Sequence, residues 1–293
     1  DEYLDLVAIG NIADSMDLSS PETRYYVYEG LRNIKNKFIA EMVKEHIGEE
    51  KNLIYPHNFA FSINPKINAV IRVGKDEEKE DLFRVLCGVE ESSVNGRTGK
   101  TETLPQKMKR VSGNVHKRQK TTRDKWAKKF KAQIEENNLN DNAFILIQVD
   151  EKFERELGGV IASSISQEYR KPTLIMVWNE EKKSYTGSLR GHDSVTKNTK
   201  DFLEGLELFN YLGGHQQACG FGINKDKLFT LNETINTKVE ELGNGNTDLV
   251  GVDFVITENQ VSVELTHDVY QYEYLWGKGA TTPQFALHMT VDT

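Results

Sequence analysis

Residues 213–223, GGHQQACGFGI, place a histidine between two glycines and two side-chain amides. Glycine leaves the backbone open to close approach, and a histidine beside exposed amides can hydrogen-bond a phosphate oxygen. Gly213, Gly214 and His215 are therefore candidates for an anion site. Two glycines that follow an expected helix most often form a helix C-cap, and by itself the stretch favours the cap.

A second pair of polar residues lies upstream in SYTGSLRG, residues 184–191. Residues i and i+2 of a strand point to the same face, so Ser188 and Arg190 would lie side by side. A hydroxyl next to a guanidinium fork is well suited to phosphate. A serine two residues before an arginine is common, and alone it predicts nothing.

Asp14 ends the apolar run of residues 5–14. Carboxylates at the ends of strands in α/β folds lie where ligands bind, and hard cations prefer such oxygens. A turn or N-cap aspartate is the ordinary alternative, and Asp17 is a second candidate nearer the expected cap. Asn68 and Arg72 are four residues apart and would share a face if their segment were helical, although a solvated polar pair would look the same.

A basic segment runs from Arg97 to Lys131. It contains thirteen Lys or Arg residues and only two acids, which gives it a net charge of +11 in a chain of net charge −8. A charge run is often only the solvated face of a helix. A long run of nearly one sign inside an acidic protein also fits the electrostatic footprint of a nucleic-acid-binding surface.

Composition excludes several classes of protein. With 38% hydrophobic and 28% charged residues, the 293-residue chain is typical of a globular protein with about two domains. The sequence has no apolar run of about 18 residues, so we expect no membrane span. The acidic start is unlike a signal peptide. Cys87 and Cys219 are the only cysteines, which argues against a disulfide framework and favours a reducing cytoplasm.

Two different patterns of elements would position these residues. The elements expected in the first half are a strand at 6–9, a helix at 20–47, a strand-like piece at 58–74, an acidic helix at 76–94, a flexible link at 92–115 and a basic helix at 116–137. Those expected afterwards are strands at 143–150, 171–179 and 184–191, helices at 158–170 and 200–212, and a strand, helix and strand over 248–293. The alternation after residue 138 predicts an α/β domain. Both ends look cut through domains, so we expect a piece of a longer protein.

Four of these pieces together resemble motifs of the DHH phosphoesterases in their RecJ-like form. DLVAIGNIADSMDL (5–18) resembles the fourth motif of that family, and INPKINAVIRVG (63–74) resembles its APRINAAGRM signature. SYTGSLRG resembles KGSGRS, and GGHQQACGF resembles the GGHxxAAGF motif of the DHH-associated domain. The order of the four is far more specific than any one of them, and the similarity spans nearly the whole chain.

The resemblance implies an α/β fold in four segments. Residues 1–75 would be the C-terminal part of a DHH catalytic domain, and 76–137 a helical basic linker. Residues 138–247 would form the α/β DHH-associated, substrate-binding domain. WGKGATTPQFAL (276–287) resembles the segment that leads into an OB-fold, so 248–293 would be a connector towards one.

The resemblance also implies a metal-dependent 5′-to-3′ exonuclease that hydrolyses the phosphodiesters of single-stranded DNA. Asp14 would be a metal ligand for Mn²⁺ or Mg²⁺ and, with His215, part of the catalytic set. Ser188 and Arg190 would hold the terminal phosphate, Gly213, Gly214 and His215 would bind the strand, and Asn68 and Arg72 would support the site. The basic residues expected to contact nucleic acid are Lys117, Arg118, Lys125, Lys128 and Lys129, bordering a groove between two domains.

The chain departs from the family pattern in informative ways. The Asp-His-His motif and the earlier metal-binding aspartates are absent, so we expect no nuclease activity from this chain alone. Lys66 replaces an arginine and Ile71 a glycine, while Glu154 falls where the family often has histidine. The implied partners are single-stranded DNA and replication or repair proteins such as a single-stranded-DNA-binding protein. The implied location is the cytoplasm of a bacterial, or virus-infected bacterial, cell.

Two alternatives remain. A nano-RNase or cyclic-dinucleotide phosphodiesterase of the same family shares the Ser-x-Arg strand and the glycine-rich histidine motif. The PKINAVIR segment, the long basic linker and the C-terminal extension argue against it. A catalytically dead DNA-binding partner of a replication complex is the second alternative, and the state of an upstream Asp-His-His motif would decide it.

Overall fold

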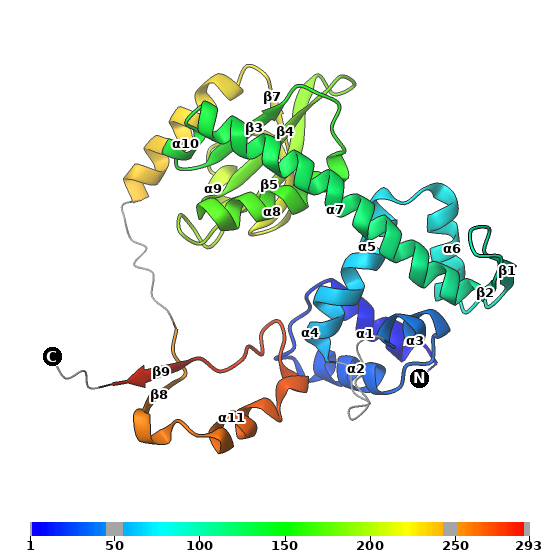
Figure 1. Ribbon diagram of the computed structural model, residues 1–293. Coiled ribbons are helices and arrows are strands. Elements are labelled where there is room, and N and C mark those ends of the chain that lie inside the picture. The colour runs from blue at the N-terminus through cyan, green and yellow to red at the C-terminus, as the bar shows by residue number, and fades with distance from the viewer. Residues whose placement is uncertain (1, 45–54, 243–250, 290–293) are drawn as a thin grey trace. The chain divides into compact units, whose positions relative to one another are not determined.

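The computed structural model describes residues 2–44, 55–242 and 251–289. They fall into two compact units, the first made of Asp1–Gln119 with Val250–Thr293 and the second of Lys120–Leu249. Figure 1 shows the elements of both units. The four domain limits expected from the sequence stay predictions. No helix in the described part of the chain is long and apolar enough to cross a membrane.

The first unit opens with three helices, α1 (Leu4–Ala13), α2 (Pro21–Arg32) and α3 (Lys37–Val43). The strand predicted at 6–9 is therefore wrong, because its residues form the middle of α1. The helix predicted over 20–47 is interrupted after Arg32, and its last three residues lie outside the described ranges. The buried carboxylate of Asp5 accepts the backbone N–H groups of Lys35 and Asn36, and the Asn36 side chain caps α3.

A continuous helical stretch follows in place of the strand-like piece predicted at 58–74. It consists of α4 (Pro56–Asn58), a π-helical turn (Phe59–Ile63) and α5 (Asn64–Val73). Its buried apolar residues Ile63, Ile67 and Val70 are four and three apart, which is the spacing of a helix face. Pro65 lies at the start of α5, where a missing N–H costs nothing. The acidic helix α6 (Asp76–Leu86) comes next, at the start of the range predicted for it.

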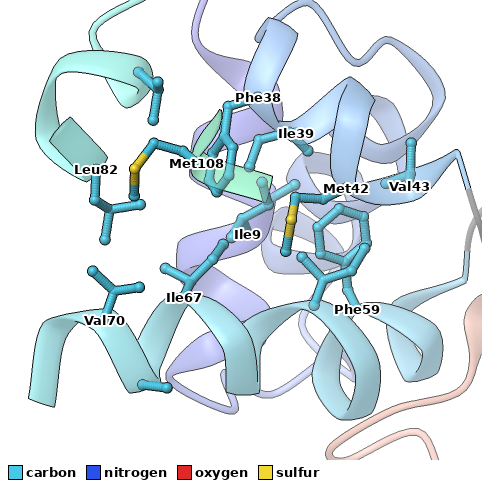
Figure 2. Packing of buried hydrophobic residues seen from close by; sticks show 14 of the residues in the cluster. Ile9, Phe38, Ile39, Met42, Val43, Phe59, Ile67, Val70, Leu82 and Met108 are labelled. Atoms are coloured by element: carbon cyan, nitrogen blue, oxygen red, sulfur yellow. The ribbon is translucent and has the colours of Figure 1, made fainter. Parts of the chain in front are cut away.

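The core of the first unit is built from these helices. Figure 2 shows the aromatic, aliphatic and methionine side chains that fill it, among them Phe38, Ile39, Met42, Phe59, Ile67, Val70, Leu82 and Met108. Helices α1 and α2 approach closely at Gly30, where a Cβ would lie 2.6 Å from the Cβ of Ala8. A larger residue at Gly30 would therefore force the two helices apart.

The flexible link predicted at 92–115 is instead ordered. Strands β1 (Ser92–Val94) and β2 (Thr101–Thr103) pair in a hairpin, and helix α7 (Leu104–Glu136) begins directly after it. The side chain of Asn95 accepts the N–H groups of Arg97 and Thr98, which closes the turn. Helix α7 starts twelve residues before the predicted basic helix and ends one residue before its predicted end. Its residues up to Gln119 belong to the first unit and the rest to the second.

The last described segment also belongs to the first unit. Strand β8 (Phe254–Thr257) pairs in parallel with β9 (Phe285–His288), and α11 (Val263–Tyr270) lies between them in sequence. This matches the strand, helix and strand expected there. The part of that prediction that covers 248–250 and 290–293 lies outside the described residues.

The second unit is a five-stranded mixed sheet with helices, in the strand order β3-β4-β5-β7-β6. The strands are β3 (Ile145–Val149), β4 (Thr173–Asn179), β5 (Ser184–Arg190), β6 (Phe209–His215) and β7 (Ala218–Asn224). Only β3 and β4 are parallel, and α8 (Gly158–Tyr169) connects them. The predicted strands at 143–150, 171–179 and 184–191 and the helix at 158–170 are confirmed, as is the α/β class.

The helix predicted at 200–212 is wrong in its second half. Helix α9 (Thr199–Glu204) is short, and residues 209–215 form strand β6 because they pair with β7. Gly213 and Gly214 are therefore strand residues, and the helix C-cap interpretation is wrong. Helix α10 (Leu228–Leu242) buries Leu231 and Ile235 in the same core cluster as Leu203, so α9 and α10 contribute to one core of the sheet.

Candidate functional site

The register of three strands brings the predicted phosphate residues together. Arg190 on β5 lies opposite Ala218 on β7, which lies opposite His215 on β6. One row along, Ser188 lies opposite Gly220, which lies opposite Gly213. Residues directly opposite one another point to the same side of a sheet, and so do residues two apart on a strand. All six share one side, which we call the open face.

The open face of β7 carries almost no side chain. Its residues there are Ala218, Gly220 and Gly222, whereas Cys219, Phe221 and Ile223 point to the other side and are buried in the core cluster. A Cβ on Gly220 would meet nothing nearer than 3.7 Å, so the glycine is not needed for packing. The alternation gives a bare backbone floor between Ser188 on one side and His215 on the other.

A β-bulge in β6 turns Phe209 away from the open face. Phe209 pairs with Ile223 and Tyr211 pairs with Gly222, so Asn210 is the extra residue. Without the bulge, Phe209 and Tyr211 would point the same way. Instead Phe209 packs edge-on against Phe221 in the core at 5.7 Å, and Tyr211 faces outward. Bulges turn side chains in this way next to binding sites.

The N-terminus of α8 lies against the predicted phosphate residues. A Cβ on Gly158 would lie 3.3 Å from the hydroxyl oxygen of Ser188, and one on Gly159 would lie 2.5 Å from Nη2 of Arg190. The glycines therefore let the first turn of the helix come close to both side chains. Backbone N–H groups and the positive end of the helix dipole favour an anion at such a point. Nη1 of Arg190 donates to the carbonyl oxygen of Leu189 at 2.7 Å, which orients the guanidinium.

The tip of the β6–β7 hairpin is fixed by Gln217. Its side-chain Nε2 donates to Oδ1 of Asp193 at 2.7 Å and to the carbonyl of Thr196 at 2.8 Å. Its backbone carbonyl accepts the N–H of Gly191 at 2.8 Å. These bonds tie the hairpin tip to the loop after β5. The exposed His215, two residues before Gln217, is held near the end of β5 that carries Arg190.

A cavity of ≈ 190 Å³ opens beside these residues within the second unit. Tyr211, Ser188, Phe153 and Arg155 contribute to its walls. Arg155 is held in place because its guanidinium donates to Oγ1 of Thr186 at 3.3 Å and to the carbonyl of Trp178 at 2.7 Å. Ser188 and a fixed cation thus face one small, partly aromatic space.

Asp14 is the C-cap residue of α1 and is exposed. The prediction that it closes a strand is wrong, because the apolar run before it is helical. No group of three or more His, Cys, Asp or Glu that could hold a metal ion occurs within residues 2–44, 55–242 and 251–289. The described residues therefore do not by themselves complete a metal centre around Asp14, and we derive no chemical step through one. Ser15 and Met16, which follow it, line a cavity of ≈ 700 Å³ in the first unit.

Asn68 and Arg72 both lie on α5, one turn apart, which is the helical arrangement in which they share a face. Asn68 is half-buried and Arg72 exposed. The positions that depart from the family pattern, Lys66 and Ile71, are on the same helix, and Ile71 is exposed.

Lys117, Arg118, Lys125, Lys128 and Lys129 are all exposed on α7. The last three belong to the second unit, and we call them the basic stripe. Arg118 is paired with Glu78 at 3.1 Å, and Lys129 is paired with Glu151. In the second unit α7 buries Trp126 and Phe130, which pack on Phe153, a wall of the ≈ 190 Å³ cavity. This packing connects the helix that carries Lys125, Lys128 and Lys129 to the cavity wall. Glu154 accepts the indole N–H of Trp126 at 2.9 Å.

Sequence reasoning missed four residues of the open face and its surroundings. These are Gly158, Gly159, Gly220 and Tyr211. The paired glycines at the start of a predicted helix were a usable signal, because glycine is a poor helix former and its presence there implies close contact. Tyr211 was missed because residues 200–212 were expected to form a helix, whereas strand β6 places it on the same face as Gly213.

No family model matches the chain. The YorK protein of Bacillus subtilis strain 168, named as a proposed prophage SPbeta-derived single-strand DNA-specific exonuclease, is 33% identical over 294 residues. The match covers 98% of this chain and 51% of YorK, so the chain spans about half the length of that relative.

More distant proteins match as well. The single-stranded-DNA-specific exonuclease RecJ of Bacillus subtilis is 23% identical over 246 residues, which cover 80% of this chain and 28% of RecJ. The crystal structure of Thermus thermophilus RecJ with Mn²⁺ superposes with a TM-score of 0.70 at 21% identity, covering 98% of this chain and 40% of that one. The structural likeness shows that the fold of this chain resembles part of the RecJ structure.

Proposed function

Because the chain is a homologue of the RecJ-like single-strand DNA-specific exonucleases, we propose that its second unit binds the phosphorylated 5′ end of single-stranded DNA for a 5′-to-3′ exonuclease. One observation carries the proposal. Ser188, Arg190 and the first turn of α8 converge at one end of the open face.

Each group has a distinct part in binding. The guanidinium of Arg190 supplies charge and paired donors for two phosphate oxygens, and the Ser188 hydroxyl supplies one more donor. The N-terminus of α8 adds the positive end of its dipole. His215 is two strands away from Arg190, about 10 Å at the usual strand spacing. It therefore binds a different group of the same ligand, and we assign it to the next part of the strand's backbone.

The bare floor of β7 supports this assignment. A nucleic-acid backbone that crosses from Arg190 to His215 would pass over Ala218 and Gly220. Side chains at these positions would hold it away from the sheet. Glycine and alanine allow close approach, which is why small residues serve phosphate-binding surfaces. On this view Gly213 and Gly214 form the strand that presents His215.

The basic stripe favours a long substrate. An exonuclease substrate carries a charge on every nucleotide, and exposed lysines along a helix bind it without regard to sequence. A dinucleotide phosphodiesterase would use the same Ser188 and Arg190 but would have no use for Lys125 and Lys128. Hydrolysis by the family, as the resemblance implies, uses Mn²⁺ or Mg²⁺ with Asp14 as one ligand, together with ligands that the described residues do not supply.

Fluorescence anisotropy with a 3′-labelled oligonucleotide tests the phosphate role. The unaltered chain should bind the 5′-phosphorylated strand more tightly than the same strand with a 5′-hydroxyl. Arg190→Ala should lower affinity for the phosphorylated strand by about 10- to 100-fold, the usual effect of losing a charge-assisted hydrogen bond, and leave the hydroxyl strand almost unchanged. An unchanged phosphate preference in Arg190→Ala would contradict the proposal.

A matched control and a substrate series sharpen the test. Lys238→Ala removes one positive charge from α10, whose buried residues lie in the core on the other side of the sheet, and should leave the preference intact. A 5′-phosphorylated dinucleotide should bind more weakly than a long strand because it cannot reach the basic stripe. Equal affinity for the two would favour the dinucleotide phosphodiesterase instead.

A further inference from the structure

Tyr211 lies on the open face of β6 with Gly213 and His215, and the bulge at Asn210 turns the preceding ring, Phe209, to the other side. It is 45% exposed, so one side of the ring is open to a ligand. Its neighbours on the strand, Phe209 and Leu212, are both packed in the core cluster of the second unit. The register shift thus turns the Phe209 ring to the core, while the Tyr211 ring faces solvent.

The ring is supported from below by a glycine. A Cβ on Gly222 would lie 2.4 Å from Cε1 of Tyr211 and 2.8 Å from Cδ1, so the ring leans across β7 and occupies the space of the missing side chain. It leans towards β5, because Gly222 pairs with Thr186 of that strand. Any residue other than glycine at position 222 would push the ring off the sheet.

Tyr211 and Ser188 line the same ≈ 190 Å³ cavity. That volume is smaller than the 300–1,000 Å³ of a site for a whole drug-sized molecule, so it suits a single planar group. The ammonium of Lys182 lies 5.5 Å from the centre of the Tyr211 ring, which adds a cation beside the aromatic surface. A ring, a hydroxyl and cations around a small space match a nucleotide, with its planar base and its phosphate.

We propose that Tyr211 stacks on the nucleobase of the nucleotide whose phosphate Ser188 and Arg190 hold. The inference rests on the proposed function, because it takes the phosphate at these two residues as its starting point. Stacking on an aromatic face accepts any base, as binding without sequence preference requires. The Tyr211 ring then holds the first base of the DNA strand, and the space left by Gly222 sets the position of the ring.

Strands that lack a single base test the assignment. The probes are a 5′-phosphorylated oligonucleotide, the same strand with an abasic first nucleotide, and the same strand with an abasic fourth nucleotide. The unaltered chain should bind the first-position abasic strand about tenfold more weakly than the intact one, and the fourth-position strand with little loss. Tyr211→Leu, which keeps an apolar contact with Gly222 but has no aromatic face, should bind the intact and first-position abasic strands equally.

Two variants separate stacking from a structural role. Tyr211→Phe should keep the discrimination because it keeps the ring, and Gly222→Val should lose it because it displaces the ring without removing it. Undiminished discrimination against the first-position abasic strand in Tyr211→Leu would overturn the proposal. If the proposed function itself is wrong, the result is different. The unaltered chain would then show no preference for a 5′-phosphate, whatever residue stands at 211.

Discussion

Arg190 and His215 lie on the same face of the sheet, two strands apart, with only Ala218 between them. They are 25 residues apart in the chain and come from strands that are not neighbours in the sheet. Strand β7 therefore spaces the two side chains, and its small residues keep the path between them clear.

Gly214 and Gly213 should respond differently to alanine. Gly214 has a φ of +131°, and a Cβ there would lie 2.7 Å from the carbonyl oxygen of Ala218. Gly214→Ala should lower the free energy of unfolding by about 1–3 kcal/mol. A Cβ on Gly213 would meet nothing within 4 Å, so Gly213→Ala should change the free energy of unfolding by less than about 0.5 kcal/mol. Urea unfolding followed by circular dichroism measures both, and equal losses would show that the register at β6 is wrong.

A side chain on the floor of the open face should weaken binding without weakening the fold. The contacts of a Cβ on Gly220 are ordinary, so Gly220→Leu should unfold at nearly the same urea concentration as the unaltered chain. Its affinity for 5′-phosphorylated single strands should fall by at least about tenfold, because the strand can no longer approach Arg190. Gly205→Ala, after α9 and with equally ordinary contacts, is the control. Full affinity in Gly220→Leu would place the ligand elsewhere.

The basic stripe should determine how strongly binding depends on salt. The double variant Lys125→Ala with Lys128→Ala should reduce the slope of log affinity against log salt by about 1.4, since each phosphate contact on a single strand contributes about 0.7. Lys129→Ala should change the slope less, because the Lys129 ammonium is already paired with Glu151 and lies 5.4 Å from the centre of the Trp126 ring. Titrations from low to physiological salt give the slopes, and an unaltered slope in the double variant would exclude the stripe from binding.

The two cysteines should differ in reactivity and in their effect on pH stability. Burial raises the pKa of the Cys219 thiol, whereas Cys87 is exposed. At pH 8 an alkylating reagent should modify Cys87 in the native protein and Cys219 only after unfolding. The unfolded chain loses its thiol proton near the ordinary pKa of about 8.5, below the folded value, so this thiol should destabilise the native state as pH rises above that range.

Mass spectrometry of the labelled peptides, with unfolding curves at pH 7 and pH 9.5, checks both parts of this prediction. The additional loss of stability at pH 9.5 should be absent in Cys219→Ala. Rapid native labelling of Cys219 would mean that the core face of β7 is open to reagent.

The parts of the site that depend on local sequence could be predicted. Ser188 and Arg190 share a face because of the two-residue period of a strand, and the basic helix follows from composition and spacing. Asp14 was predicted to end a strand, whereas it ends a helix. The run before it is apolar on nearly every side, which removes the periodicity that separates a helix from a strand. The direction of Tyr211 was not predicted, because residues 200–212 were expected to be helical. In strand β6 it lies two residues before Gly213 and therefore on the same face.

Gly213, Gly214, Gly220 and Gly222 all lie in the β6–β7 hairpin. Each glycine gives up more backbone freedom on folding than alanine would, by about 0.5–1 kcal/mol, and β6 is the edge strand of the sheet. This hairpin should therefore open more often than the central strands, and its amide hydrogens should exchange with solvent sooner. A bound DNA strand would close those openings, so the slowing of exchange at these four glycines would report occupancy of the open face residue by residue.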